Sequence, residues 1–295
     1  MTGKQPTSPQ PAASFIVLTM GDRPQELQRA IESIQRQEGV TAEVVVISNG
    51  AGEVDVSADC LLFVSRENLG IPGGRNLGAA NSTGDVMFFL DDDAWYVDTN
   101  LAANVLEAFA ADESLGVVSC RIADPVTGLS EQRHIPRVRV GDPGRGSEVT
   151  TFLGGACAVR RSVFELCGPY PKRFFYSHEE SDLAWRALDA GFTIQYRGDL
   201  RILHPAAPPS VHPEYHFRSA RNRVWLARRR LPWLVAIPHV MIWTSRSLLQ
   251  AGSAAARRQV WHGFKAGWNE PAGERSAMSW RTVWRMTKLG RPPIV

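Results

Sequence analysis

The stretch Val86–Asp93 reads VMFFLDDD, a run of five apolar residues followed by three aspartates. A short apolar run of this kind is typical of a strand buried on both faces of a parallel sheet. Sheets of that class bind ligands at the carboxyl ends of their strands, which is where the aspartates stand. Side chains alternate along an extended segment, so we expect Asp91 and Asp93 to point the same way.

Two carboxylates held close together repel each other unless a cation lies between them. Carboxylates are hard oxygen donors that suit Mg²⁺ or Mn²⁺, and either ion can bridge a diphosphate. The triplet therefore predicts a divalent metal site. The alternative is a solvated acidic turn that caps the following helix.

The surrounding sequence alternates strand-like and helix-like segments, which predicts βαβ units, a mostly parallel sheet and an α/β fold. The strands are expected at Ser14–Met20, Glu43–Ile47, Val86–Leu90, Gly116–Cys120 and Phe192–Tyr196, and the helices from Pro24 and at Leu101–Ala111, Arg161–Cys167 and Glu179–Ala190. The Gly-rich run Asn68–Gly78 is expected to lead into a further helix. Arg137–Thr150 is polar and Gly-rich, and we expect a mobile loop there.

Charge divides the chain into two parts. Arg218–Val295 carries 15 Lys and Arg against two acids, and it holds seven of the nine tryptophans. The remainder carries 18 basic and 28 acidic residues, although the whole chain has a net charge of only +3. We therefore expect three parts: a disordered lead-in at residues 1–14, a catalytic domain at 15–210, and a basic, Trp-rich helical region at 211–295. The basic region is expected to bind an anionic partner.

Other features of the sequence indicate where in the cell the protein is expected. The first 14 residues lack the apolar run of a signal peptide, and the four cysteines show no C-x-x-C spacing, which together favour the cytoplasm. The longest uncharged apolar stretch, Leu231–Ser245, falls short of the ~20 residues of a spanning helix. For the basic tail, four interpretations are open: an anionic membrane surface, a solvated helical face, a partner chain, and a helical cap on the catalytic domain. Nucleic acid is not expected, because no nucleic-acid-binding motif accompanies the charge.

A second acidic cluster lies in the segment SHEESDLAWR, residues 177–186. Carboxylates in the first turn of a helix favour the helix dipole, so simple N-terminal capping is one interpretation. The other is that Glu179 or Glu180 removes a proton from an acceptor hydroxyl, because neighbouring acids raise a carboxyl pKa toward neutrality.

The third motif is the run ENLGIPGGRNLG, residues 67–78. Its glycines allow close backbone approach, and Arg75 is placed to face phosphates. The spacing matches neither the dinucleotide fingerprint nor the P-loop. Tight packing of a helix on the sheet is the structural alternative for each glycine.

Taken in order, the segments FIVLTMGDRP, VVVISNG, ENLGIPGGRNLG, FFLDDD, LGGACAVRRSVFE and HEESDLAWRALDAG resemble the family 2 glycosyltransferases, and especially their bacterial rhamnosyltransferase-type members. The resemblance spans about Phe15–His204. It implies a GT-A-type α/β fold and inverting transfer of a hexose from a nucleotide diphosphate sugar.

The resemblance also implies residue roles. The metal ligands would be Asp91, Asp93 and His204, and the base would be Glu180, with Glu179 second. The residues expected to bind the nucleotide sugar are Thr19, Asn49, Asn68, Arg75, Asn76, Asp91 and Asp92. Those expected on the acceptor side are Gly154, Gly155 and Asp182. Many members carry Asp where this chain has Asn49, which can still bond a pyrimidine, so UDP and dTDP both stay open.

The expected acceptor is a cell-envelope glycan or a lipid-linked glycan, reached by peripheral attachment to the inner face of the cell membrane. A metal-dependent nucleotidyltransferase and a non-catalytic glycan- or membrane-binding module are the alternatives. The sequence does not indicate an oligomeric state.

Overall fold

The computed structural model describes residues 12–137, 141–205 and 214–294. The expected lead-in lies outside the described residues up to position 11, and part of the expected loop after Arg137 does too. The first strand begins at Ala13, two residues before the predicted domain boundary.

Within the described residues, nine strands form one sheet in the order β3-β2-β1-β4-β8-β6-β9-β5, and β7 pairs with β9 off this path. The strands are β1 (Ala13–Thr19), β2 (Ala42–Asn49), β3 (Cys60–Ser65), β4 (Val86–Asp91), β5 (Trp95–Tyr96), β6 (Leu115–Ala123), β7 (Ser147–Glu148), β8 (Ala156–Arg160) and β9 (Thr193–Leu203). From β3 to β4 every pairing is parallel, as expected. Beyond β4 the sheet is mixed, because β8 runs antiparallel to both β4 and β6.

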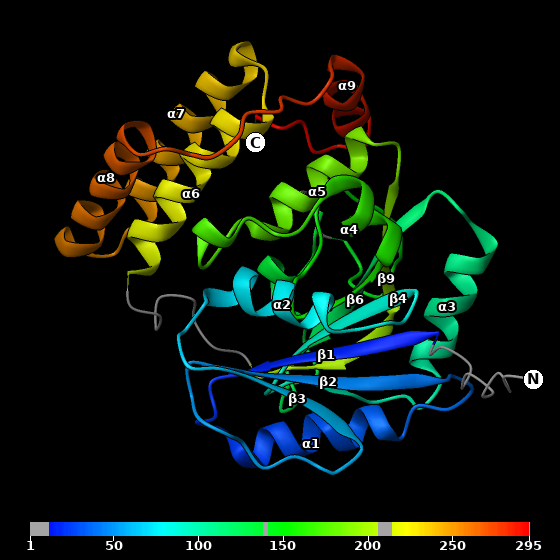
Figure 1. Ribbon diagram of the computed structural model, residues 1–295. Coiled ribbons are helices and arrows are strands. Elements are labelled where there is room, and N and C mark those ends of the chain that lie inside the picture. Colours follow the sequence, from blue (N-terminus) through cyan, green and yellow to red (C-terminus); the bar gives the residue numbers. More distant parts are fainter. Residues whose placement is uncertain (1–11, 138–140, 206–213, 295) are drawn as a thin grey trace, which may run out of the picture.

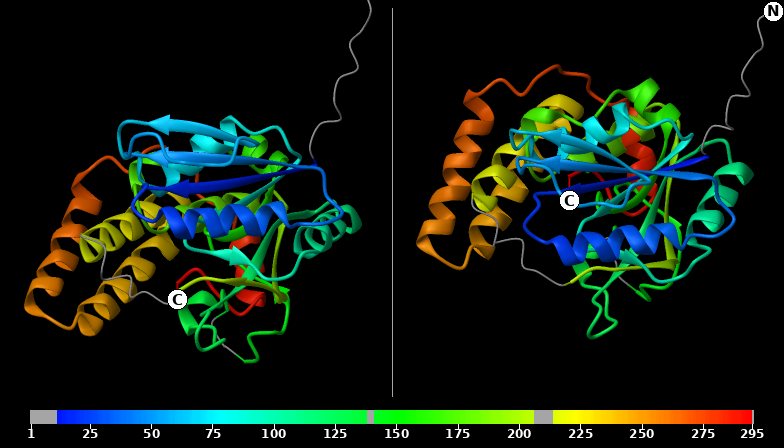
Figure 2. Two further views of the ribbon diagram at one scale, coloured as in Figure 1. Left: turned by 90° about the horizontal axis from the view of Figure 1, so that it is seen from below. Right: turned by 60° about the horizontal axis from the view of Figure 1, so that its bottom comes forward.

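Helices cover both faces of this sheet (Figure 1). They are α1 (Pro24–Gln35), α2 (Gly70–Ala80), α3 (Leu101–Ala111), α4 (Arg161–Cys167), α5 (Glu179–Asp189), α6 (Tyr215–Arg230), α7 (Trp233–Gln250), α8 (Ala254–Asn269) and α9 (Trp280–Lys288). In two further views α6, α7 and α8 stand together at one side of the sheet domain (Figure 2).

Alternation along the central strands builds two apolar cores. Phe15 of β1 and Phe88 of β4 stack on the face covered by α1 and α3. Their chain neighbours Ile16 and Phe89 point into the opposite core, which α5 and the C-terminal helices complete. Both strands are therefore buried on both faces, as their continuous apolar runs predict.

The Gly-rich run differs from the prediction, because it forms the helix α2 itself instead of a loop that leads into one. Glycine is unfavourable in a helix by about 1 kcal/mol relative to alanine, so packing must stabilise α2. A Cβ at Gly74 would lie 2.3 Å from Leu18 Cδ1, and one at Gly78 would lie 2.3 Å from Ile16 Cγ2. These glycines let the helix rest directly on β1, which is the packing alternative raised from the sequence.

Candidate active site

The acidic triplet lies at the carboxyl edge of the sheet, where β4 ends beside β1. Asp91 and Asp93 point the same way, as predicted: Asp91 Oδ2 is 3.8 Å and Asp93 Oδ1 is 3.3 Å from Nε2 of His204. Asp92 points away from them and accepts a 2.7 Å hydrogen bond from the Thr19 hydroxyl. The strand ends at Asp91, and a turn follows in which Ala94 N donates to the Asp91 carbonyl at 3.0 Å. This turn, and not strand alternation, divides the triplet into a pair that faces His204 and one carboxylate that faces β1.

His204 directly follows β9, which is separated from β4 by β8 and β6 in the sheet. Its side chain faces Asp91 and Asp93. Its Nδ1 lies 2.8 Å from the carbonyl oxygen of Pro205, which can only accept a hydrogen bond, so Nδ1 carries the proton. Its Nε2 faces the carboxylates of Asp91 and Asp93. Two carboxylate oxygens and an imidazole nitrogen are a donor set that fits Mn²⁺ or Mg²⁺. Across the described ranges, however, no cluster of three such side chains is already drawn together as a metal site.

Arg75 links the triplet to the acidic start of α5. Its guanidinium lies 3.1 Å from Asp91 Oδ1 and 3.2 Å from Glu180 Oε1. The side chain is 4% exposed. Burial by itself lowers the pKa of Arg75, but the surrounding carboxylates Asp91 and Glu180 outweigh it and raise that pKa above its ordinary value. Arg75 therefore stays a cation whose hydrogen bonds go to protein carboxylates.

Gly154 and Gly155, which precede β8, form one wall of the site. A Cβ on Gly154 would lie 2.1 Å from the Arg75 guanidinium, and one on Gly155 would lie 2.0 Å from Asp91 Oδ2. A side chain at either position would displace these charged groups from where they now lie. The structure thus brings the two predicted glycines against the predicted metal ligand and base.

Glu179 and Glu180 open α5 but occupy different environments. Glu179 is 1% exposed, and its Oε2 has no hydrogen-bond partner in the described part of the chain. Burial, with the charge of Glu180 in second place, raises the pKa of Glu179 well above its ordinary value. Glu180 is 22% exposed and accepts a hydrogen bond from Arg75. Of the two, Glu180 is the carboxylate that an acceptor can reach.

The backbone that leads into α5 is strained. Phe175, Ser177 and His178 have φ of 63°, 75° and 72°, in the left-handed region that glycine favours. Non-glycine residues in that region cost about 1–3 kcal/mol each and gather at functional sites. The Phe175 carbonyl accepts a 2.8 Å hydrogen bond from Ile71 N at the start of α2, so this turn docks against the helix that carries Arg75.

Several predicted nucleotide contacts use their hydrogen bonds inside the protein. Asn49 Oδ1 accepts from Leu69 N at 2.8 Å, and Asn68 Oδ1 accepts from Gly70 N at 2.9 Å, so both hold the turn before α2. Asn76 donates to the Tyr170 carbonyl at 2.8 Å and accepts from Tyr170 N. In this arrangement Asn76 joins α2 to the segment after α4.

The prediction that Asp182 lies on the acceptor side is wrong in this structure. Its side chain is 0% exposed, and its carboxylate pairs with Arg186, Arg229 and Arg230 at 2.9, 3.1 and 2.8 Å. Asp182 is therefore a buried anchor between α5 and α6. Its position three residues after Glu179 puts it on the same buried face of α5, away from the more exposed Glu180, and sequence spacing alone did not show what that face packs against.

Sequence reasoning missed Arg23. Its guanidinium lies 2.8 Å from Asp92 Oδ1 and also pairs with Asp93. Its position in the sequence does indicate the site, because Arg23 follows β1, which runs parallel to β4. The carboxyl ends of both strands lie at the same edge of the sheet. Arg23 balances part of the negative charge of the triplet.

Comparison with known proteins gives the class. The glycosyl transferase family 2 model matches residues 14–168, more than half of the chain, and the chain belongs to this family. The glycosyltransferase AglE of Haloferax volcanii is 24% identical over 238 residues, which are 76% of this chain and 77% of AglE.

Solved structures agree on the fold. The crystal structure of GalNAc-T7 with UDP, GalNAc and Mn²⁺ matches with a TM-score of 0.62 and 15% identity, over 90% of this chain and 57% of that one. The mannosyltransferase PcManGT of Pyrobaculum calidifontis, in complex with GDP-Man and Mn²⁺, matches with a TM-score of 0.56 and 18% identity, over 95% of this chain and 85% of that one. The fold is of the GT-A type, and the protein is a glycosyltransferase. These findings favour that class over a nucleotidyltransferase or a non-catalytic module.

Proposed function

We propose that this chain transfers a hexose, with inversion, from a UDP- or dTDP-linked donor to a hydroxyl acceptor. One observation carries the proposal: Arg75 contacts Asp91 of the acidic triplet and also Glu180 at the start of α5. His204 faces Asp91 and Asp93 in the same cluster. One half of this site suits a diphosphate with its metal, and the other half suits an acceptor hydroxyl.

Glu180 is the base in this proposal. The acceptor oxygen forms a bond to the anomeric carbon, its proton passes to Glu180, and the bond from that carbon to the diphosphate breaks, so nucleoside diphosphate leaves. Arg75 orients the Glu180 carboxylate through a 3.2 Å contact. Gly154 leaves room for this pairing. Glu179, buried and with a raised pKa, supports the turn and is not exposed to an acceptor.

Asp91, Asp93 and His204 would hold Mn²⁺ or Mg²⁺. When bound, such an ion supplies positive charge that stabilises a departing diphosphate. The GalNAc-T7 and PcManGT structures each contain Mn²⁺ together with UDP or GDP-Man, which supports the proposal. Asp92 is 2% exposed and is bound by Thr19 and Arg23, so its carboxylate is engaged within the protein.

Incubation with a panel of nucleotide sugars tests the reaction class. We expect release of nucleoside diphosphate when both an acceptor and Mn²⁺ are present. Formation or consumption of pyrophosphate instead would identify nucleotidyl transfer. NMR of the product glycoside then reports inversion or retention at the anomeric carbon.

The metal role is tested with Asp93→Ala, which removes one carboxylate of the pair that faces His204. We expect Mn²⁺-dependent binding of nucleoside diphosphate to be abolished while the far-UV circular dichroism stays unchanged. Asp98→Ala removes an exposed acid a few residues away and serves as the control. Equal calorimetric affinities with and without Mn²⁺ in wild type would contradict the metal site.

We also propose that the acceptor is a cell-envelope or lipid-linked glycan and that the chain attaches to the inner face of the cell membrane. No described helix combines the length and apolar character that crossing a bilayer requires. One face of α7 is nevertheless apolar and exposed: Leu234 is 80%, Ile237 55% and Met241 56% exposed. Exposed tryptophans on α7, α8 and α9 accompany it, and such rings favour the headgroup layer.

A further inference from the structure

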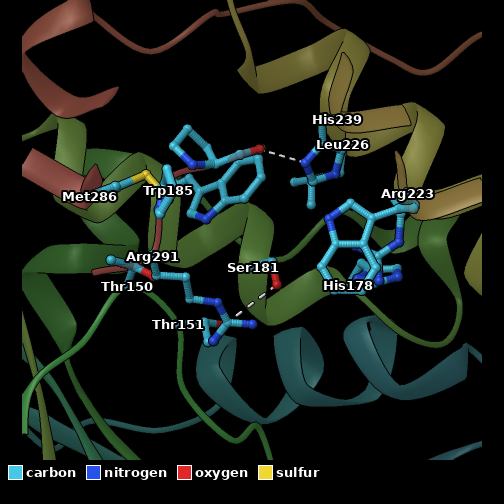
Figure 3. A pocket seen from close by; sticks show the side chains of 13 residues that line it. Thr150, Thr151, His178, Ser181, Trp185, Arg223, Leu226, His239, Met286 and Arg291 are labelled. Atoms are coloured by element: carbon cyan, nitrogen blue, oxygen red, sulfur yellow. Dashed lines mark hydrogen bonds between the residues drawn. The ribbon is translucent and has the colours of Figure 1, made fainter. Parts of the chain in front are cut away.

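A cavity of about 80 Å³ lies on the side of α5 that faces the C-terminal helices. Its walls come from the start of α5, from α6 and α7, and from the segment after α9 (Figure 3). Ser181 of the lining follows Glu180 directly in the chain, and Thr151 lies three residues before Gly154. The cavity therefore shares two chain segments with the candidate active site.

Two arginines line this cavity without a carboxylate partner. In Figure 3, Arg223 of α6 and Arg291 approach from either side of Ser181. Among the described residues neither forms an ion pair, and all aspartates and glutamates of the sequence fall within those residues. The terminal carboxylate belongs to Val295, which lies outside them. The Arg223 guanidinium instead lies 4.0 Å from the centroid of the Trp243 ring.

Both arginines are half-buried, and partial loss of water makes these cations costly. Burial lowers the pKa of Arg223 to about 9, with the positive charges of Arg291 and Arg246 acting in the same direction and Tyr215 against it. Burial likewise lowers the pKa of Arg291. A cation taken out of water without a counter-charge is destabilising unless something anionic binds beside it.

The same cavity holds buried polar atoms that lack partners. Thr150 Oγ1, His239 Nε2 and Trp243 Nε1 make no hydrogen bond within the described part of the chain. Thr150 and His239 are 1% and 3% exposed. His239 Nδ1 donates to the Pro293 carbonyl, and burial lowers the pKa of His239 to about 3, so its Nε2 is an acceptor. The cavity thus offers two cations, two donors and one acceptor.

We propose that this cavity binds a phosphate group carried by the sugar acceptor, next to the hydroxyl that Glu180 deprotonates. Guanidinium groups recognise phosphate oxygens through paired N–H donors, and the Thr150 hydroxyl and Trp243 N–H supply further donors. A hydroxyl of the ligand can donate to His239 Nε2. The acceptor class is therefore a phosphorylated glycan or glycolipid. This inference rests on the proposed function, because it requires that the chain transfers a sugar to an acceptor molecule.

Inorganic phosphate probes the cavity without any sugar. Its effect on the thermal unfolding midpoint is measured in EDTA, at constant ionic strength set with chloride, so that the metal-dependent site does not contribute. We expect phosphate to raise the midpoint of wild type and of Arg258→Gln, which loses an exposed arginine of α8. Arg223→Gln and Arg291→Gln should weaken the apparent phosphate affinity at least tenfold. A response in either variant equal to that of wild type would overturn the proposal.

Acceptor kinetics distinguish acceptor phosphate from a free anion. An alkyl glycoside and its phosphorylated counterpart are compared as acceptors with the same donor. We expect wild type to prefer the phosphorylated acceptor, and Arg291→Gln to raise its KM about tenfold while leaving the neutral acceptor and donor hydrolysis unchanged. Equal use of both acceptors by wild type would show a site for free anions only and refute the inference.

Two further variants keep the test decisive if an arginine variant does not fold. Arg223→Lys retains the charge and should keep part of the phosphate response, and Thr150→Val removes a donor with little change in shape. If wild type uses no nucleotide sugar at all, the proposed function fails. In that case the phosphate titration still reports separately on the cavity.

Discussion

Two adjacent carboxylates, Glu179 and Glu180, show how environment separates residues that the sequence leaves equivalent. Both stand in the first turn of α5, yet one is 1% and the other 22% exposed. Arg75 lies 3.7 Å from Glu179 Oε1 and 3.2 Å from Glu180 Oε1. The difference in exposure is the reason why Glu180, and not Glu179, is the proposed base.

Glu180→Gln keeps the side-chain shape and removes the proton acceptor. We expect turnover to fall by about 10²–10⁴, with donor affinity nearly unchanged because the triplet is untouched. Steady-state kinetics and calorimetric titration of donor measure the two effects. Glu179→Gln should lower turnover much less, and the reverse order would exchange the two roles.

Asp92 predicts a pH dependence of stability. Burial raises its pKa to about 6, against hydrogen bonding from Thr19 and attraction to Arg23. An unfolded aspartate has a pKa of about 3.9. Between these values the unfolded chain has released its proton while the folded chain retains it. The stabilising contribution is therefore complete below about pH 4 and is lost as the pH rises through about 6.

Asp92→Asn removes this titration. Relative to wild type, we expect the variant to gain about 2 kcal/mol in the free energy of unfolding between pH 4 and pH 7, since one pKa unit corresponds to about 1.36 kcal/mol. Guanidinium chloride unfolding in EDTA at both pH values measures the difference. Parallel pH profiles for the two proteins would contradict the raised pKa.

At the scale of elements, α6 differs most from its expected role. Its arginines were expected to face something anionic, but several are engaged within the protein. Arg228 donates to the carbonyls of Gly267, Trp268 and Glu270, and both Arg229 and Arg230 pair with Asp182. The charge of α6 therefore serves to join α6 to α5 and α8. Outward-facing charge in the tail belongs to other residues, among them Arg257 and Arg258 of α8.

Asp182 is the centre of this junction. Burial alone would raise its pKa, but Arg186 and Arg230 outweigh it and hold the pKa of Asp182 below its ordinary value. Asp182→Asn leaves buried arginines without a counter-charge, so we expect a loss of about 3–5 kcal/mol in the free energy of unfolding. Chemical denaturation measures it. Asp199→Asn, which breaks an exposed pair with Arg197, should cost about 1 kcal/mol or less and is the control. Similar losses in both variants would contradict the anchoring role.

At the scale of the whole molecule, the tail is part of the folded body and not a separate appendage. Trp225 of α6 and Val235 of α7 share one apolar core with Ile16 and Phe89 of the sheet. Ser279, which caps α9, donates to Asp189 at the end of α5, and Arg285 of α9 reaches Glu148 of β7. The membrane face proposed above, on α7, is therefore rigidly placed relative to the active site.

Liposome co-sedimentation tests that face. We expect binding that increases with anionic lipid content and weakens at high salt, because exposed basic residues contribute about 1 kcal/mol each near an anionic leaflet. A triple variant, Leu234→Gln with Ile237→Gln and Met241→Gln, should lose most of the binding. The control is Val126→Gln with Leu129→Gln, which removes two exposed apolar side chains from a loop outside α7. It should not change liposome binding. Binding that ignores lipid charge and salt would refute the proposed attachment.

The sequence by itself determined the parallel half of the sheet and the position of the triplet. The short apolar run of β4 and its alternation with helical segments indicate a strand buried on both faces of a sheet, and the aspartates that follow it then lie at the carboxyl edge. It also placed His204 and the two glycines near the site through the resemblance to family 2. These are local patterns, which a single chain segment carries on its own.

Only the tertiary structure decided which charges face one another. Asp182 and Asn76 lie within the sequence motifs, but their side chains bond to other parts of the protein. Arg23 and Arg223 lie outside the predicted set of site residues. Arg23 pairs with Asp92 in the candidate active site, and Arg223 lines the cavity beside α5. The physical reason is that a charged side chain acts through partners brought from distant segments, and burial sets its cost. Sequence spacing records neither the partners nor the burial.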